Sequence, residues 1–140
     1  MEFVVVSSLT SKQVDDLMGL YQFTYWAQAR SREEVDRMLK GRGYLFGAVE
    51  AASGRLCAFA RVLSDDLFRA VIFDVVVHPD FRGRGLAKMI FDAILSHPVL
   101  GRVENVLLFC KDDVVELYER FGFEEYEGMH LMMRKSTSDL

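Results

Sequence analysis

The spacing of apolar residues along the chain predicts alternating helices and strands. In residues 11–23 apolar side chains recur every three or four positions, which is typical of one buried helix face. Ser31 and Glu34 have the spacing of a capping box, which predicts that a second helix begins after Ser31. Two further helices are predicted over residues 86–96 and 112–121. About four helices are therefore expected.

Runs rich in β-branched and aromatic residues predict the strands. These runs cover about residues 3–7, 44–49, 56–63, 70–77 and 105–110. A last hairpin is predicted around Glu127–Gly128, which raises the expected number of strands to six or seven. Helices and strands in this mixed order indicate an α/β fold of the α+β mixed type.

Length and composition predict one small domain over residues 1–140. A chain of 140 residues with 51% hydrophobic content is suited to a single core. Cys57 and Cys110 each lie in an apolar, strand-like run, so we expect two buried free thiols and a reducing, cytoplasmic compartment. The N-terminus lacks a basic, apolar leader pattern, and no run of about 18 apolar residues occurs. We therefore expect neither export nor membrane insertion.

The strand that ends at Val77 leads into a basic, glycine-rich turn and then into a helix. Backbone N–H groups at a helix start lack internal partners and carry partial positive charge, so they bind anions. Gly83 and Gly85 allow a close approach to an anion, and full charges come from Arg82, Arg84 and Lys88. The net charge is −4 and the basic residues cluster only here, which predicts one bound anion and no nucleic acid.

Two common phosphate-binding motifs do not fit this turn. A P-loop ends in Gly-Lys-Ser/Thr, and that triplet does not occur in the sequence. A dinucleotide-binding Gly-x-Gly-x-x-Gly motif has glycine where this chain has Lys88. The remaining pattern, Arg82-x-x-Gly85-x-Ala87 after Val-x-His-Pro, resembles the acyl-CoA pyrophosphate loop of the GNAT superfamily of N-acyltransferases.

A second motif strengthens this resemblance. Leu117-Tyr118-Glu119-Arg120-Phe121-Gly122-Phe123 resembles the Leu/Phe-Tyr-x-x-x-Gly-Phe signature of the same superfamily. The resemblance implies a GNAT fold: a central, mostly antiparallel mixed sheet of six to seven strands, flanked by about four helices. It also implies a splay between the strands at about residues 70–77 and 105–110. Lys111 stands where many members have an asparagine that contacts the cofactor.

The resemblance further implies an acetyl-CoA-dependent N-acetyltransferase that needs no metal. Its chemistry would be direct attack of a primary amine of a small molecule on the thioester, without a covalent enzyme intermediate. The Val75 N–H would meet the thioester carbonyl, and the Val77 backbone would pair with pantetheine. The full set of implied cofactor-binding residues is Val75, Val76, Val77, Arg82, Gly83, Arg84, Gly85, Leu86, Ala87, Lys88, Asp113 and Leu117.

Tyr118 and Asp74 are the predicted catalytic residues. Tyr118 would donate a proton or a hydrogen bond to the leaving thiolate; the alternative is a tyrosine that only packs. Asp74, inside an apolar run, would serve as the base, although an ion pair with Arg61 of the neighbouring strand explains it equally well. Asp113 is also expected to cap the helix that carries Tyr118.

The acceptor pocket is predicted near Tyr25, Trp26 and Arg30. Aromatic residues at this spacing also pack against a sheet, so core packing is an alternative reading of Tyr25 and Trp26. A different function stays open: an acyl-CoA sensor without turnover that acts on a protein partner. A homodimer is an open possibility for the quaternary state.

Overall fold

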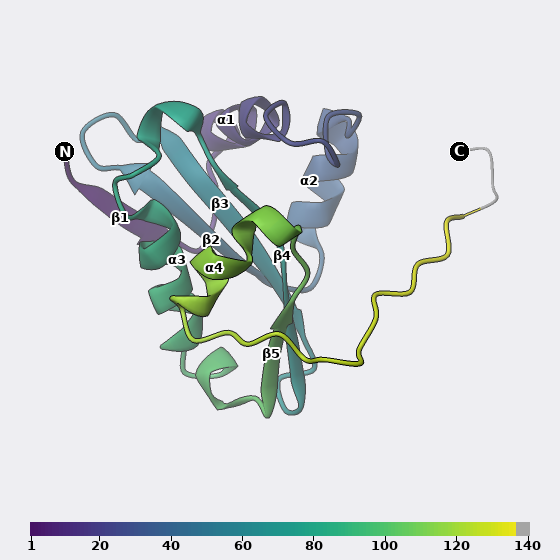
Figure 1. Ribbon diagram of the computed structural model, residues 1–140. Helices are drawn as coiled ribbons and strands as arrows, with labels where there is room; N and C mark the ends of the chain where they lie inside the picture. The colour runs from purple at the N-terminus through teal and green to yellow at the C-terminus, as the bar shows by residue number, and fades with distance from the viewer. Residues whose placement is uncertain (137–140) are drawn as a thin grey trace. The chain divides into compact units, whose positions relative to one another are not determined.

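The computed structural model of the protein describes residues 1–136 (Figure 1). The chain divides after Leu108 into two compact units. Within the described residues, the first unit contains the sheet and three α-helices, and the second contains one short α-helix. The single domain over residues 1–140 stays a prediction.

A mixed sheet forms the centre of the first unit. Its strands are β1 (Phe3–Val6), β2 (Tyr44–Glu50), β3 (Leu56–Ser64), β4 (Arg69–Val77) and β5 (Asn105–Leu108). They lie in chain order, with β1 to β4 antiparallel and β5 parallel to β4. The predicted mixed, mostly antiparallel sheet is therefore confirmed.

Three α-helices cover this sheet. They are α1 (Ser11–Tyr21), α2 (Arg32–Lys40) and α3 (Leu86–Leu95). Figure 1 shows α1 and α2 on one side of the sheet and α3 on the other. The three positions agree with the helices expected from apolar spacing.

Side-chain caps fix where α1 and α2 begin. The predicted capping box at Ser31 is present, because the Ser31 hydroxyl accepts from the Glu34 N–H and Glu34 accepts from the Ser31 N–H. Thr10 and Gln13 form a second capping box at α1. The second box has the same spacing and could have been predicted.

Two apolar layers stabilise the first unit. On the side of α1 and α2, Leu17, Tyr21 and Phe59 are fully buried in one cluster with Val76. The α3 layer buries Leu86, Ile90, Phe91 and Ile94. Each fully buried side chain of this size contributes about 1.5–3 kcal/mol relative to exposure. These layers hold β4 and the start of α3 in fixed positions.

The second unit contains a 3₁₀ turn over Asp112–Val114 and the short helix α4 (Val115–Glu119). One helix over residues 112–121 was predicted, so its position is confirmed and its length is not.

The number of strands was predicted wrongly. Five strands occur within residues 1–136, and no strand follows Leu108 there. The chain turns at Glu127–Gly128 as expected, but no ladder flanks this turn. An isolated hairpin is marginal without a surface that buries one face, and apolar side chains here stay exposed, among them Tyr126, Met129 and Met132.

The two cysteines lie in different environments. Both are free, as predicted, but only Cys57 is buried, so the prediction of a buried Cys110 was wrong. The physical reason is the early end of β5 at Leu108, which leaves Cys110 outside the sheet.

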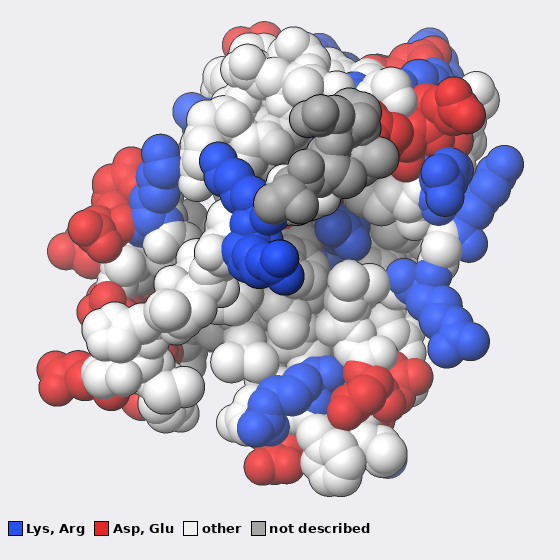
Figure 2. Space-filling view, turned by 90° about the vertical axis from the view of Figure 1, so that its right-hand side faces the viewer, with Lys and Arg blue, Asp and Glu red and all other residues white. Residues whose placement is uncertain are grey.

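The surface carries charges of both signs. On the face shown in Figure 2, basic and acidic side chains lie next to each other in several places. No helix within residues 1–136 is long and apolar enough to cross a membrane.

Candidate functional site

The turn between β4 and α3 contains two left-handed glycines and leads into a helix start without a side-chain cap. A 3₁₀ turn over Pro79–Phe81 follows β4, and no side chain caps α3 where it begins at Leu86. Gly83 and Gly85 have φ angles of 78° and 77°, in the left-handed region that only glycine adopts at low cost. The two glycines are needed for this conformation.

A row of backbone donors results. The N–H groups of residues 83–88 donate to no partner within residues 1–136. The first hydrogen bond of the helix runs from the Met89 N–H to the Gly85 carbonyl, at 3.0 Å. Donors at a helix start, together with the helix dipole, suit a phosphate or diphosphate.

Three basic side chains surround these donors. The Arg84 guanidinium lies 5.4 Å from the centre of the Phe81 ring, and the Lys88 ammonium lies 2.6 Å from an Asp92 oxygen. The Arg82 side chain is exposed and makes no interaction within residues 1–136. Two of the three charges are therefore held in place near the row of donors.

A bulge interrupts β4 at Asp74 and Val75. Phe59 of β3 pairs with Val76, but Arg61, two positions on, pairs with Phe73, so β4 contains one extra residue here. Asp74 has a φ of 58°, which is uncommon for a residue other than glycine and tolerated best by Asn and Asp. The bulge turns the Asp74–Val75 backbone out of the regular ladder.

Beyond the bulge, β4 has a strand neighbour on one side only. Registered pairs with β5 end at Ile72 and Leu108, while β4 continues to Val77. Within residues 1–136, the backbone of residues 73–77 pairs with β3 alone. The pairing therefore stops because β5 ends at Leu108, and the splay between residues 70–77 and 105–110 stays a prediction. Val75 and Val77, the predicted backbone contacts of the cofactor, lie along this unpaired edge.

Asp74 is enclosed by donors. Its Oδ2 accepts from Arg30 Nη1 at 2.7 Å, Arg61 Nε at 2.8 Å and the Tyr21 hydroxyl at 3.2 Å. The carboxylate is only 5% exposed, against 30% for Arg30 and 21% for Arg61. The predicted Arg61 pair is confirmed, and Arg30 adds a second. Two guanidiniums and one hydroxyl therefore bind a single carboxylate oxygen.

The charges of this cluster shift two pKa values. Burial, the Asp74 charge and the hydrogen bond to Asp74 raise the pKa of Tyr21 well above its ordinary value. Burial lowers the pKa of Arg30, but the hydrogen bond and charge of Asp74 outweigh this effect and raise it. Arg30 therefore stays charged and Tyr21 stays neutral at physiological pH.

The aromatic residues after α1 lie beside this cluster. The Arg30 guanidinium lies 5.1 Å from the Tyr21 ring centre and 5.3 Å from that of Trp26. Trp26 is 38% exposed and Tyr25 is 71% exposed. The structure thus joins Trp26 and Arg30, two predicted acceptor residues, to Asp74, and leaves Tyr25 on the surface.

In the second unit, Tyr118 lies in a helix end that explains its motif. The N–H groups of Gly122 and Phe123 donate to the carbonyls of Glu119 and Tyr118, the pattern of a Schellman cap. Gly122 has the required positive φ, 93°, and the Phe123 and Tyr118 rings lie 6.4 Å apart. Gly122 and Phe123 of the motif therefore form the C-terminal cap of the helical segment that contains Tyr118.

The other predicted residues of this unit flank Tyr118. Burial, and to a smaller extent Cys110, raise the pKa of Tyr118, which makes its hydroxyl a poorer acid. Leu117 is half-buried. Asp113 does not cap α4, because it lies inside the 3₁₀ turn before it and no side chain caps either helix. That prediction was wrong.

Sequence reasoning missed the part that Tyr21 plays. Its hydroxyl binds the Asp74 carboxylate, 53 residues away. Arg30 is 44 residues from the same carboxylate. Neither spacing carries a local signal. No group of three or more His, Cys, Asp or Glu placed to hold a metal occurs within residues 1–136.

Comparison with known proteins gives consistent matches. The pattern of the acetyltransferase (GNAT) family matches residues 12–123. The uncharacterized N-acetyltransferase ycf52 of Pyropia yezoensis is 31% identical over 122 residues, which covers 86% of this chain and 70% of that protein.

Two further relatives extend the comparison. The rice (Oryza sativa subsp. japonica) protein named serotonin N-acetyltransferase 2, chloroplastic, is 34% identical over 96 residues, covering 67% of this chain and 48% of that one. A crystal structure of a Xanthomonas campestris protein assigned to the GNAT family is 33% identical, with a TM-score of 0.80, and covers 97% of this chain and 94% of that one.

Proposed function

Because the chain belongs to the GNAT acetyltransferase family, we propose that it transfers the acetyl group of acetyl-CoA directly to a primary amine of a small molecule. Acyl transfer is the activity of this family, and acetyl-CoA is its donor. The observation that carries the proposal is the row of free N–H donors at residues 83–88, which lies among Arg82, Arg84 and Lys88. These groups would hold the diphosphate of CoA.

The bulge at Asp74 and Val75 supplies the second requirement of the reaction. With the diphosphate held at α3, pantetheine would extend along the unpaired edge of β4. The Val75 N–H would donate to the thioester oxygen, where negative charge develops as the amine attacks. The C–N bond forms, the C–S bond breaks, the amine loses a proton and CoA leaves as the thiol. Tyr118 would stabilise the leaving sulfur with its hydroxyl.

Asp74 acts in this proposal by positioning the bulge. Its carboxylate is already hydrogen-bonded by Arg30, Arg61 and Tyr21. These bonds hold Asp74 in its left-handed conformation, and thereby orient the Val75 N–H. The proton of the amine would leave through water.

The acceptor would lie against the aromatic residues beside α1. Trp26 offers a partly exposed ring next to the Asp74 cluster, and Tyr25 before it in sequence is exposed, which suits an amine with an aromatic or other apolar body. The rice relative is named for serotonin, an amine of this kind. Serotonin and related arylalkylamines are therefore the first acceptors to test.

Calorimetric titration with CoA tests whether the row of N–H donors at residues 83–88 binds the cofactor. Gly85→Glu adds negative charge at the row of donors and should abolish binding. Gly54→Glu is a matched control, because Gly54 has nearly the same φ, 76°, equally open space around its Cβ position, and lies in the turn between β2 and β3. Equal CoA affinity in the two variants would refute the site.

Thiol release tests turnover. Steady release of CoA from acetyl-CoA with one amine of a panel is expected. Tight CoA binding without release across arylalkylamines, polyamines, amino sugars and amino acids would instead identify a non-catalytic sensor.

A further inference from the structure

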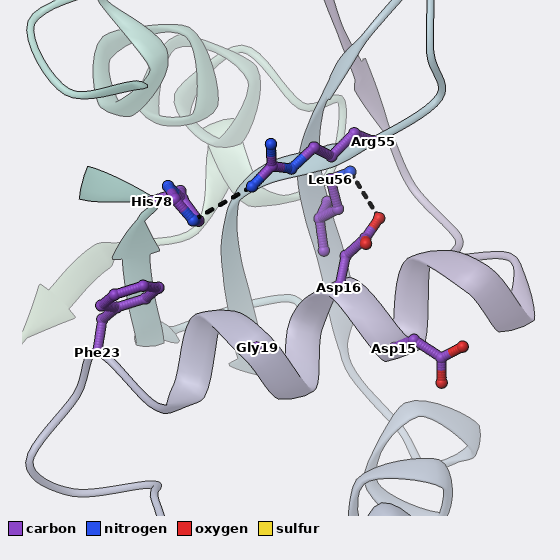
Figure 3. A pocket seen from close by; sticks show the side chains of 7 residues that line it. All are labelled: Asp15, Asp16, Gly19, Phe23, Arg55, Leu56 and His78. Carbon is purple, nitrogen blue, oxygen red and sulfur yellow. Dashed lines mark hydrogen bonds between the residues drawn. The ribbon is translucent and has the colours of Figure 1, made fainter. Parts of the chain in front are cut away.

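A cavity beside α1 contains two hydrogen-bond donors that face each other. Its volume is about 340 Å³, and its walls come from α1, the start of β3 and the residue after β4. Figure 3 shows the side chains of His78 and Arg55 pointing toward one another, with Phe23 below His78 and Asp16 rising from α1. No motif or local spacing connects these residues in the sequence.

The bonds of His78 fix its tautomer. Nδ1 accepts a hydrogen bond from the Asp80 N–H at 3.0 Å, where His78 caps the 3₁₀ turn. An imidazole whose Nδ1 accepts must carry its proton on Nε2. That nitrogen lies 3.2 Å from Nη2 of Arg55, and a guanidinium can only donate. Two N–H donors therefore meet without an acceptor between them.

Neither donor side chain is free to turn away easily. The Phe23 ring lies 4.9 Å from the His78 ring, edge to face. The Arg55 guanidinium lies 5.1 Å from the centre of the Phe81 ring. An oxygen that accepts from both donors resolves the conflict, and a carboxylate also matches the charge of Arg55.

The wall opposite these donors carries the reverse charge. Oδ2 of Asp16 accepts from the Leu56 N–H at 3.1 Å, whereas Oδ1 has no partner within residues 1–136. The neighbouring Asp15 is ion-paired with Arg32 and points away from Arg55. Asp16 therefore presents one carboxylate oxygen for a cationic group.

We infer that this cavity binds a free α-amino acid. The ligand carboxylate accepts from Arg55 and from Nε2 of His78, and its ammonium donates to Asp16. Its side chain lies along the exposed ring of Phe23. The volume is ample for such a molecule. The inference does not depend on acetyl transfer, because none of these residues takes part in the proposed reaction.

Gly19 provides a test that leaves the charged groups intact. It lies inside α1 on the cavity wall, and an added Cβ meets nothing within 4 Å. Gly19→Leu should fill the cavity without disturbing the fold, because leucine is a good helix former. Gly19→Ala is the matched control, since it also removes the glycine but leaves most of the cavity open.

The experiment is calorimetric titration of the full chain, without acetyl-CoA, with each of the protein amino acids. At least one should bind, its amide and its N-acetyl derivative should bind roughly tenfold or more weakly, and Arg55→Gln should weaken binding roughly tenfold to hundredfold. Gly19→Leu should abolish binding and Gly19→Ala should preserve it. The inference is overturned if no amino acid of the panel binds, if the amide binds equally well, or if Gly19→Leu retains the affinity.

Discussion

Replacement of Asp74 by asparagine should destabilise the protein strongly. Asparagine tolerates the left-handed φ of 58° nearly as well as aspartate, so the change removes the charge with little added backbone strain. It leaves Arg30 and Arg61 with no carboxylate partner in a half-buried site. Removing one partner of a fully buried ion pair costs about 3–5 kcal/mol. Because the two guanidiniums retain some exposure, we expect about 2–3 kcal/mol here.

Urea unfolding measures this loss. With a slope of about 1–3 kcal/mol per molar urea, the midpoint should fall by roughly 1–2 M. The control is Asp36→Asn, which removes an exposed i,i+4 partner of Arg32 and should leave the midpoint nearly unchanged. Equal shifts in the two variants would refute the reasoning.

The pH dependence separates the structural role of Asp74 from a catalytic one. When folding raises the pKa of a group, the protonated group stabilises the folded state. This contribution to the free energy of unfolding is complete at pH values below the pKa in the unfolded chain, and it is lost as the pH rises through the pKa in the folded protein. For Arg30 the raised pKa places this loss far above physiological pH. The destabilisation by Asp74→Asn should therefore be constant between about pH 6 and 9. If Asp74 were the base, activity per folded molecule would drop at neutral pH and recover at high pH.

Three further outcomes are expected. Tyr118→Phe should keep the ring packing of α4 and CoA affinity while turnover with a good acceptor falls by at least about tenfold; wild-type turnover would leave Tyr118 as a packing residue. Tyr21→Phe should flatten the alkaline limb of the stability curve, because the raised pKa of Tyr21 gives stability that is complete below about pH 10 and lost at higher pH; an unchanged limb in a pH series of urea melts would contradict this. A thiol reagent should label Cys110 quickly and Cys57 only on unfolding, and equal rates by mass spectrometry would show that Cys57 is accessible.

The parts of the site that depend on local chemistry could be predicted from sequence. Gly83 and Gly85 predict a left-handed backbone conformation that glycine adopts at low cost. Ser31 and Glu34 predict the start of a helix. Both predictions succeed because the interactions involved span only a few residues. The Asp74–Arg61 pair could also be foreseen, since the two residues lie on neighbouring predicted strands.

Other features depend on contacts that spacing does not encode. The run from Val71 to Val77 reads as an unbroken strand, and only the register with β3 reveals its extra residue. The donors that Arg30 and Tyr21 supply to Asp74 come from distant helical segments, so tertiary packing decides them. The missing C-terminal strands have a similar origin, because a strand forms only where a partner edge and a buried face are both present.

The bulge in β4 also limits which insertions and deletions the chain can tolerate. Phe73 and Val76 both pair with β3 residues that face α1, although three positions separate them instead of the usual even number. Deleting one residue at the bulge would leave Phe73 and Val76 two positions apart, so regular alternation would keep both on the face of α1 and the ladder with β3 would become continuous. Adding one more residue there would instead turn every side chain from Val76 onward to the opposite face. We therefore expect the core to tolerate a one-residue deletion at the bulge, with loss of the main-chain N–H proposed for Val75, and not to tolerate a one-residue insertion.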